Sequence, residues 1–543
     1  MLQKVATTGV DLNNVYDQTL RRIKEQGGGR SRLGMEVLMW VSHAERPLRI
    51  DELCHALAVK MEATDLDLEN VRPQDTVLRS CLGLAVVDSE TSTVRLIHYT
   101  LQEYLSESGI LPDAHKILAQ SCLVYLNYDQ VKGHPADNVS NLGDMPFLQY
   151  SSLYWGGHAK IELSDLVKTL ALELLSRYDN HICSTLLFDE IRGYHASWDT
   201  PYMFTGLHYA SYLGIDEIVA ALIQVKGRDI NQSDCIGYTP LMWAAQQGNQ
   251  GAVTLLLTQD DIDPDKPGRD GETPLSCASR NEHEGVVRLL LARGDVNPDK
   301  PDNYGRTPIC CASFEGHEGV VRLLLARDDV NPDKPDNDGI TPLWWASKSG
   351  HEGVVKLLLA QDDVNPDNPD NDGETPLSVA SLHGHEGVVR LLLARNDVNP
   401  DKPNNYGETP FRVASRMGHE GVVRLLLSQR AIDPNQPDNN SPTPLSSASG
   451  NRHEEVAIPP VARDDFTPDE PNNDDLAPLQ RASSNEHEEA VTPPVARDDI
   501  IPNEPNNSGR APPKISSIRK YRRIIAEHVP RLWGKKKKGK ERL

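Results

Sequence analysis

The chain has 543 residues, of which 38% are hydrophobic and 25% charged, and this is typical of a globular protein with several domains. Its net charge of −23 is unevenly distributed, because residues 514–543 carry twelve Lys and Arg against two acids, or +10, and leave −33 for the rest. The acidic body disfavours nucleic-acid binding except through this tail. The eight cysteines form no CxxC pair, and neither a signal peptide nor an apolar run of membrane-spanning length occurs. We therefore expect an intracellular, cytoplasmic protein without a membrane span.

The first segment of the chain combines helical periodicity with one short hairpin. Apolar residues recur at helical spacing from Leu12 to Ile23 and again around residues 35–41. The pattern then predicts a third helix, a short fourth helix, two strands joined by the turn-forming SETST, and a last helix; these are 51–59, 76–81, 84–88, 94–98 and the stretch HYTLQEYL. Helices followed by a two-stranded wing indicate a winged-helix domain, to which we assign residues 1–110. Seven acids against two bases between residues 51 and 75 argue against DNA binding by it.

Two parts of this region resemble a known family. The stretches VYDQTLRRI, VLMWVSHAERPLRIDELCHALAV, CLGLAVVD and VRLIHYTLQEYL resemble the winged-helix module that follows the NACHT domain in signal-transduction ATPases with ankyrin repeats. The helical residues 111–204, which include PFLQYSSLYWGGHAK, are similar to the linker of that family. The resemblance implies that His98, at the end of a strand, senses a bound nucleotide; local packing is the alternative interpretation.

The chain also departs from that family. No NACHT domain precedes the module in the sequence. A NACHT domain that acts in trans, or one lost through truncation, is the alternative to a chain that works alone. The stretch GKKKKGKE near the end of the chain fits the spacing of a P-loop, but Glu541 stands where the Mg-binding Ser or Thr must be. We therefore expect no nucleotide hydrolysis by this chain alone.

A 34-residue repeat occupies the middle of the chain. Thr-Pro recurs at this spacing from Thr239 to Thr443, with a Thr205-Gly variant one period earlier, and a representative unit reads TPLSVASLHGHEGVVRLLLARNDVNPDKPNNYGE. Threonine caps a first helix, and proline at the first helical position lacks an N–H that would need a partner. Gly-His then turns the chain into a second helix, and an Asn-Pro-rich loop leads to the next unit. Such helix pairs can bury their apolar faces only against one another, which predicts a solenoid.

The unit resembles the ankyrin repeat, with one extra residue in the loop. The resemblance implies about seven repeats over residues 205–450, and a chain dominated by α-helices in which a winged-helix domain and a helical linker precede the solenoid. Later copies decay, because Pro459 and Pro460 replace leucines of the second helix and each interior proline costs about 3 kcal/mol. We expect residues 451–513, with fourteen acids against five bases, to be disordered, and residues 514–543 to form a basic tail.

Comparison of the repeats with one another indicates where a partner binds. Columns that are constant must serve the scaffold, whereas columns that vary at exposed positions are free to serve a partner. In ankyrin proteins the residues just before Thr-Pro and at the end of the first helix line the concave face and finger tips; drift on a solvated surface is the alternative. The predicted partner-binding residues are Tyr304, Arg306, Phe314, Ile340, Lys348, Leu382, His383, Tyr406, Arg416 and Met417.

Trp344 and Trp345 stand side by side in the first helix of their unit. Cys311 and Val379 occupy the column of Trp345 in the neighbouring units, so we expect at least one tryptophan, Trp345, in the core. Trp344 replaces a histidine of the usual pattern, and we expect it to be partly exposed.

No constellation of catalytic or metal-binding residues is evident. Histidines recur once per repeat from His283 to His487 and cannot converge on one ion, so we interpret them as scaffold turn residues. The adjacent Cys310 and Cys311 point in different directions on a helix and form neither a redox pair nor a zinc half-site. Neither GxSxG nor HExxH occurs. We expect no catalytic residue, no metal, no cofactor and no enzymatic activity.

Three functions follow from these patterns. The first is a scaffold or regulatory protein that binds a protein partner through the ankyrin face. The second is a regulatory fragment of a NACHT signalling ATPase, with the nucleotide-binding domain in trans or lost by truncation. The third is a nuclear adaptor acting through the basic tail, whose KISSIRKYRRIIAEHVPRLW and GKKKKGKER stretches also suit anionic lipid or nucleic acid. A tail that folds back on the acidic segment before it is the simplest interpretation of this region.

Overall fold

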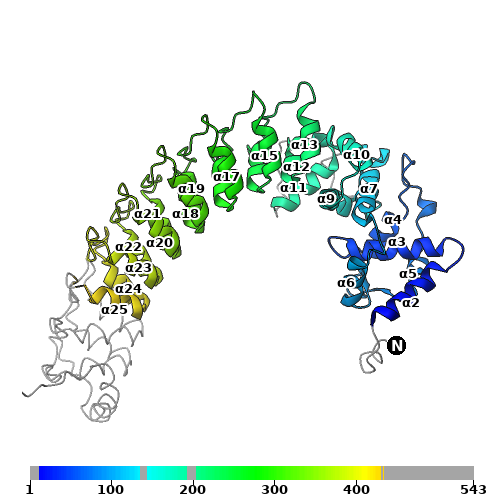
Figure 1. Ribbon diagram of the computed structural model, residues 1–543, viewed down its shortest axis with the longest axis horizontal. Coiled ribbons are helices and arrows are strands. Elements are labelled where there is room, and N and C mark those ends of the chain that lie inside the picture. Colours follow the sequence, from blue (N-terminus) through cyan, green and yellow to red (C-terminus); the bar gives the residue numbers. More distant parts are fainter. Residues whose placement is uncertain (1–11, 135–142, 193–202, 430–431, 433–543) are drawn as a thin grey trace, which may run out of the picture. The chain divides into compact units, whose positions relative to one another are not determined.

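A computed structural model of the chain describes residues 12–134, 143–192, 203–429 and 432. They divide between two compact units, Met1–Val296 and Asn297–Leu543, hereafter the N-terminal and C-terminal units. Helices dominate the described residues (Figure 1), and their one sheet is a two-stranded hairpin. The end of the predicted repeat array, the segment predicted to be disordered and the basic tail lie outside the described residues.

The N-terminal unit begins with the predicted winged-helix arrangement. Its elements are α2 (Leu12–Lys24), α3 (Arg30–His43), α4 (Ile50–Ala56), η1 (Leu68–Asn70), α5 (Gln74–Ser80), β1 (Ala85–Val87), β2 (Val94–Leu96) and α6 (Tyr99–Glu107). The strands pair antiparallel with Val86 opposite Arg95, and the backbone N–H of Val94 donates to the carbonyl of Leu48, which holds the hairpin against the segment before α4. The hairpin is confirmed, although the third helix ends at Ala56, three residues earlier than predicted.

The linker helices pack against this domain through aromatic side chains. They are α7 (Ala114–Leu126), α8 (Asp129–Lys132), α9 (Leu148–Ile161), α10 (Asp165–Leu175), η3 (Tyr178–Asn180) and α11 (Ile182–Arg192). Helix α7 packs along α9 and also contacts α3. The buried ring of Trp40 on α3 meets Phe147 and Tyr150 edge-on, with centroids 5.4 and 6.0 Å away. The winged-helix domain and the linker therefore share one core.

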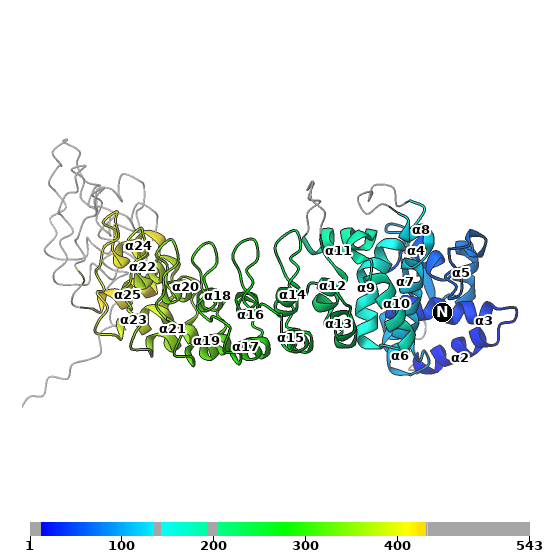
Figure 2. The same cartoon turned by 90° about the horizontal axis from the view of Figure 1, so that it is seen from above.

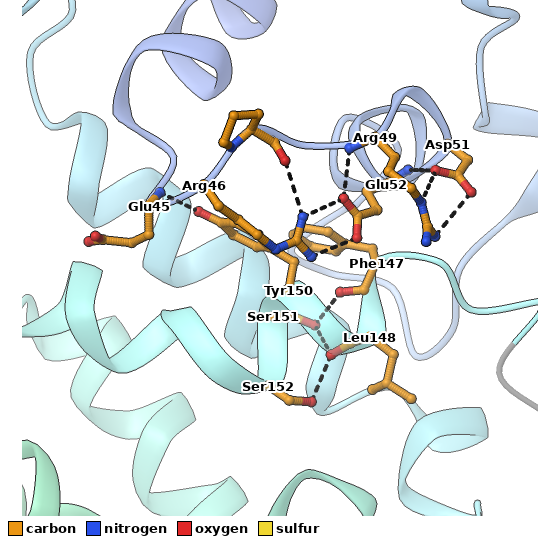
Figure 3. Close-up of polar contacts among 11 residues, drawn as sticks. Glu45, Arg46, Arg49, Asp51, Glu52, Phe147, Leu148, Tyr150, Ser151 and Ser152 are labelled. Carbon is orange, nitrogen blue, oxygen red and sulfur yellow. Dashed lines mark hydrogen bonds and ion pairs between the residues drawn. The ribbon is translucent and has the colours of Figure 1, made fainter. Parts of the chain in front are cut away.

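A buried ion pair secures the same junction (Figure 3). The Arg46 guanidinium donates two hydrogen bonds of 2.8 Å to the carboxylate of Glu52, which is 1% exposed and also accepts the backbone N–H of Arg49. The guanidinium lies 5.3 Å from the ring centroid of Tyr150 and 5.8 Å from that of Tyr154, both on α9. The hydrogen bonds to Glu52 raise the pKa of Arg46. One side chain thus satisfies a buried carboxylate in the winged-helix domain and contacts the linker.

Helix pairs follow the linker in the N-terminal unit. They are α12 (Gly206–Leu213), α13 (Asp216–Ile223), α14 (Pro240–Gln246), α15 (Gln250–Leu257), α16 (Pro274–Arg280) and α17 (Glu284–Leu291). The first pair packs on the linker: Trp155 of α9 meets the ring of Tyr209 at 5.6 Å, and a Cβ on Gly206 would lie 2.2 Å from the carbonyl oxygen of Leu175. Only glycine allows this approach, so linker and first pair form a continuous body.

The C-terminal unit consists of four further helix pairs in its described residues (Figure 2). They are α18 (Pro308–Glu315), α19 (Glu318–Leu325), α20 (Pro342–Ser349), α21 (Glu352–Leu359), α22 (Pro376–His383), α23 (Glu386–Leu393), α24 (Pro410–Met417) and α25 (Glu420–Leu427). Each first helix starts as predicted: in α20 the Thr341 side chain accepts the N–H of Trp344, and proline occupies the next position. One apolar residue of the first helix, which is Ile309 in α18, Phe411 in α24 and Leu in the other two, packs with two Val and one Leu of the second helix to form the repeated core, as with Leu343, Val354, Val355 and Leu358.

Candidate partner-binding surface

In the described residues of the C-terminal unit, the loop before each Thr-Pro, hereafter the finger, is fixed by an Asp or Asn, which is half-buried at Asp370 and buried in the other three fingers. In the finger before α20, Asp336 Oδ1 accepts the backbone N–H groups of Asp338 and Ile340 at 3.0 and 2.9 Å. Burial raises the pKa of this carboxyl, while the two N–H groups oppose the rise. The same double contact recurs at Asp302, Asp370 and Asn404. The fingers therefore hold their tips in one repeated conformation.

Adjacent fingers are also bonded to one another. The Asn337 side chain donates to the carbonyl of Asn303 at 3.0 Å, and its backbone N–H donates to the carbonyl of Tyr304 at 2.9 Å. Asn371 and Asn405 repeat both contacts with the finger before them. This asparagine ladder keeps the finger tips in register, and the sequence signal for it is the constant Asn in successive units.

One residue of each finger tip projects from this ladder. Tyr304, Asp338, Asp372 and Tyr406 occupy equivalent positions, hereafter the finger row, and all four are exposed. Tyr304 and Tyr406 are 56% and 59% exposed. No basic side chain within residues 297–429 forms an ion pair with Asp338 or Asp372. The two carboxylates, which the sequence prediction left out, complete the row with charge.

Arg306 and Ile340, predicted just before Thr-Pro, lie behind this row. The Arg306 guanidinium lies 4.8 Å from the ring centroid of Tyr304 and pairs with Asp302 at 2.7 Å, so its charge is already compensated. Ile340 is half-buried. Arg306 and Ile340 therefore pack behind the finger row and are not among its projecting side chains.

The predicted residues at the helix ends form a second exposed line. Phe314 is 42% and Met417 44% exposed, His383 is exposed, and Leu382 is half-buried. Arg416 pairs with Glu408 at 3.3 Å and lies beside Met417. This line is thus apolar at Phe314, Leu382 and Met417, and the charge of Arg416 is neutralised by Glu408 of the same repeat.

Lys348 and the two tryptophans connect the helix-end line to the core. The Lys348 ammonium lies 5.3 and 5.2 Å from the ring centroids of Trp344 and Trp345, and Trp345 meets Phe314 edge-on at 4.9 Å. The expectation for the pair was wrong in its order: Trp344 is buried and Trp345 is half-buried. Trp344 is buried because its indole N–H donates to the carbonyl of Glu374 in the next unit, at 3.1 Å.

The repeated histidines serve the scaffold, as predicted. His351, His385 and His419 each hydrogen-bond through Nε2 to a first-helix carbonyl of the preceding unit, at 2.9–3.0 Å. The ring of His385 packs over Gly350, whose φ is 78°, and a Cβ there would lie 2.7 Å from Nδ1. Nε2 of each ring is thus committed to a neighbouring unit, and the described residues include no cluster of His, Cys, Asp and Glu that could hold a metal ion.

His98, the predicted nucleotide sensor, is exposed at the start of α6. Its Nδ1 accepts the backbone N–H of Thr100 at 3.3 Å, and its ring lies 4.6 Å from that of Tyr99. It acts as a helix cap in this structure, and nucleotide sensing remains a prediction. A helix of the length and apolarity needed to cross a membrane does not occur among the described residues.

Comparison with known families identifies two components of the chain. Residues 21–114 match the winged-helix domain of GPI inositol-deacylase. Three copies of an ankyrin-repeat model match residues 171–267, 260–336 and 328–404, and a single ankyrin repeat matches residues 406–439. The predicted winged-helix domain and ankyrin repeats are thereby confirmed, and the first ankyrin match begins inside the predicted linker. No curated protein matches the chain.

Proposed function

We propose that this chain, which carries a winged-helix domain followed by ankyrin repeats, is a scaffold or regulatory protein that binds a protein partner through its fingers and helix ends. One observation carries the proposal. Within the described C-terminal unit the exposed large apolar side chains are Tyr304, Phe314, Tyr406 and Met417. All four belong to the variable columns predicted to bind, whereas the constant columns include the buried core residues and the hydrogen-bonded Thr, His and Asn of the scaffold. Exposed aromatic side chains on a rigid support are the residues that carry most binding energy in interfaces.

Binding rather than catalysis is the activity we assign. All eight cysteines lie in the described residues outside disulfides, and seven of them are buried. Burial raises the pKa of Cys310 to about 12, so its thiol stays protonated. Buried cysteines outside disulfides also support our placement of the protein in a reducing, intracellular compartment.

A second candidate function is regulation of a nucleotide-binding domain supplied in trans. The shared core of the winged-helix domain and the linker favours it, because contacts made at the winged helix would be transmitted to the first helix pairs through Trp155 and Gly206. An increase in the ATP hydrolysis of a NACHT protein when this chain is added to it would support this function. Nuclear import rests on the basic tail alone, which lies outside the described residues.

The proposed binding function can be tested with the full chain as bait. Partners captured from a cell extract are identified, purified and titrated against the wild type and against a triple variant carrying Phe314→Ala, Leu382→Ala and Met417→Ala. We expect the triple variant to bind at least about tenfold more weakly, because each buried anchor contributes roughly 1–3 kcal/mol.

A matched control separates this surface from general stickiness. Leu68→Ala, Ile161→Ala and Leu166→Ala remove the same kind of exposed side chain from the N-terminal unit. The control variant should bind like the wild type, with unchanged circular dichroism for both variants. Equal affinity of all three proteins, or equal loss in both variants, would contradict the assignment of the binding surface.

A further inference from the structure

The finger row combines ring faces with carboxylates that lack a partner of their own. Tyr304 and Tyr406 stand at its ends, and Asp338 and Asp372 lie between them. The asparagine ladder fixes the four positions before any ligand arrives, so binding would require little ordering of the surface. The surface is thus prepared for a ligand with several positive charges and at least one aromatic or apolar side chain.

The charge of the whole unit favours the same ligand. Residues 297–429 contain twenty-one Asp and Glu against thirteen Lys and Arg, a net charge of −8. The contact of Arg306 with Tyr304, at 4.8 Å, shows that the ring of Tyr304 accepts a guanidinium. A basic segment would therefore be attracted over long range by the unit and held at short range by the row.

The chain itself contains one segment of this chemistry. Residues 514–523, KISSIRKYRR, have five bases and no acid, together with Tyr521 and two isoleucines. We propose that this basic segment binds the finger row of its own chain, with its Arg and Lys side chains on Asp338 and Asp372 and the aromatic and apolar side chains against the tyrosines. The segment then covers part of the surface used for partners, so partner binding competes with it.

The length of chain between the two sites allows the contact. Residues 433–513, 81 residues, separate Ile432 from Lys514. The 63 residues 451–513 that are predicted to be disordered would span on the order of 45 Å as an ideal coil, against about 30 Å for three steps of roughly 10 Å between the first and last finger. The nearer acidic residues 451–513 offer carboxylates but only one aromatic side chain, Phe466. The finger row therefore provides contacts that this closer segment lacks.

The test uses a synthetic, fluorescently labelled peptide of residues 514–533. It is titrated into the full chain whose own segment is neutralised by Arg519→Gln, Lys520→Gln, Arg522→Gln and Arg523→Gln. We expect saturable binding that weakens at least tenfold when Asp338→Asn and Asp372→Asn are added. Tyr304→Ala with Tyr406→Ala should weaken it severalfold. The exposed pair Asp328→Asn and Asp362→Asn, which removes the same charge just after the second helices α19 and α21, should have less than a twofold effect.

Two outcomes would overturn the proposal. One is absent binding, or equal weakening by both aspartate pairs, which would mean attraction by net charge alone. The other outcome concerns the chain with its native tail. This chain should bind the peptide at least tenfold more weakly than the neutralised chain, because its own basic segment occupies the finger row. Equal binding of the peptide by the two chains would contradict the proposal. The inference rests on the proposed function only where it states that the basic segment competes with a protein partner. Since no partner is present in the titration, its failure leaves partner capture through Phe314 and Met417 untouched.

Discussion

In the winged-helix domain and linker each stabilising contact occurs once, whereas in the C-terminal unit the same contacts return every 34 residues. Within the part of the chain that the structure describes, the contacts of Arg46 with Glu52 and of Trp40 with Tyr150 do not recur in another repeat or helix pair. By contrast, the threonine caps, the histidine bonds between units and the asparagine ladder are found in successive repeats. Damage to the first region removes a unique contact, and damage to the second removes one copy of several.

This difference also explains where function can reside. A repeated scaffold is stabilised by each neighbouring pair in turn, so positions outside the repeated contacts can change without loss of the fold. Tyr304, Asp338, Asp372 and Tyr406 differ in chemistry although their backbones are held identically. In the N-terminal unit, the unique contacts instead join two domains into one body.

The largest expected effect is the loss of the ion pair at the junction. Arg46→Ala removes the guanidinium that pairs with the buried carboxylate of Glu52. That carboxylate then keeps its hydrogen bond from the backbone N–H of Arg49 but loses its counter-charge. An uncompensated buried charge costs on the order of 3–5 kcal/mol. We expect the free energy of unfolding of the N-terminal unit to fall by that amount in urea titrations, with little change in the C-terminal unit.

Arg49 provides the control for this prediction. Its guanidinium pairs with Asp51 at 3.1 Å, but both side chains are about half exposed. Removing such a pair costs roughly 0–1 kcal/mol. If Arg49→Ala destabilised the N-terminal unit as much as Arg46→Ala, burial of Glu52 could not be the cause.

A second, smaller effect follows from buried histidines in the N-terminal unit. Burial lowers the pKa of His158 to about 3, with His115 and His43 adding to the effect, and lowers the pKa of His181 to about 4. Both are neutral in the folded chain, and the unfolded chain takes up their protons first. Their stabilising contribution is therefore complete above about pH 6.5 and is lost as the pH falls toward the folded pKa, at about 1.4 kcal/mol per histidine and pH unit.

Urea titrations at about pH 7 and about pH 5.5 measure this loss. His181→Gln keeps a side-chain donor for the carbonyl of Leu126. In this variant the number of protons that the N-terminal unit takes up on unfolding should fall by one, and the slope of its stability against pH should decrease accordingly. The C-terminal unit should respond less, because His385 is only partly buried. Stability of the N-terminal unit that stayed constant or rose between these pH values would contradict the assignment of neutral, buried histidines.

The two regions also differ in how far the sequence predicts them. The repeat was predictable because its determinants are local. The side chain of Thr341 caps the helix by accepting the backbone N–H of the residue three positions later, and proline occupies the first helical position. The order of Trp344 and Trp345 was mispredicted because the partner of Trp344 is the carbonyl of Glu374, in the next unit. Within the N-terminal unit, helices and hairpin followed from periodicity, but the contact of Arg46 with Tyr150 joins residues 104 positions apart and leaves no periodic signal.

The smallest predicted effect comes from a place where one repeat departs from the others. Gly316, Gly350, Gly384 and Gly418 end the first helices of the C-terminal unit with φ between 77° and 86°, and Glu282 occupies the equivalent position in the N-terminal unit with φ 61°. This left-handed conformation costs a residue with a side chain about 1–2 kcal/mol, part of which glycine offsets by its greater freedom when unfolded. Glu282→Gly should therefore stabilise the N-terminal unit by about 0.5–1 kcal/mol in urea titrations. Gly350→Glu makes the reverse change where a Cβ would also lie 2.7 Å from His385, and it should destabilise the C-terminal unit by more than the first change gains. Destabilisation by Glu282→Gly would show that the Glu282 side chain contributes more to the repeat than its backbone conformation costs.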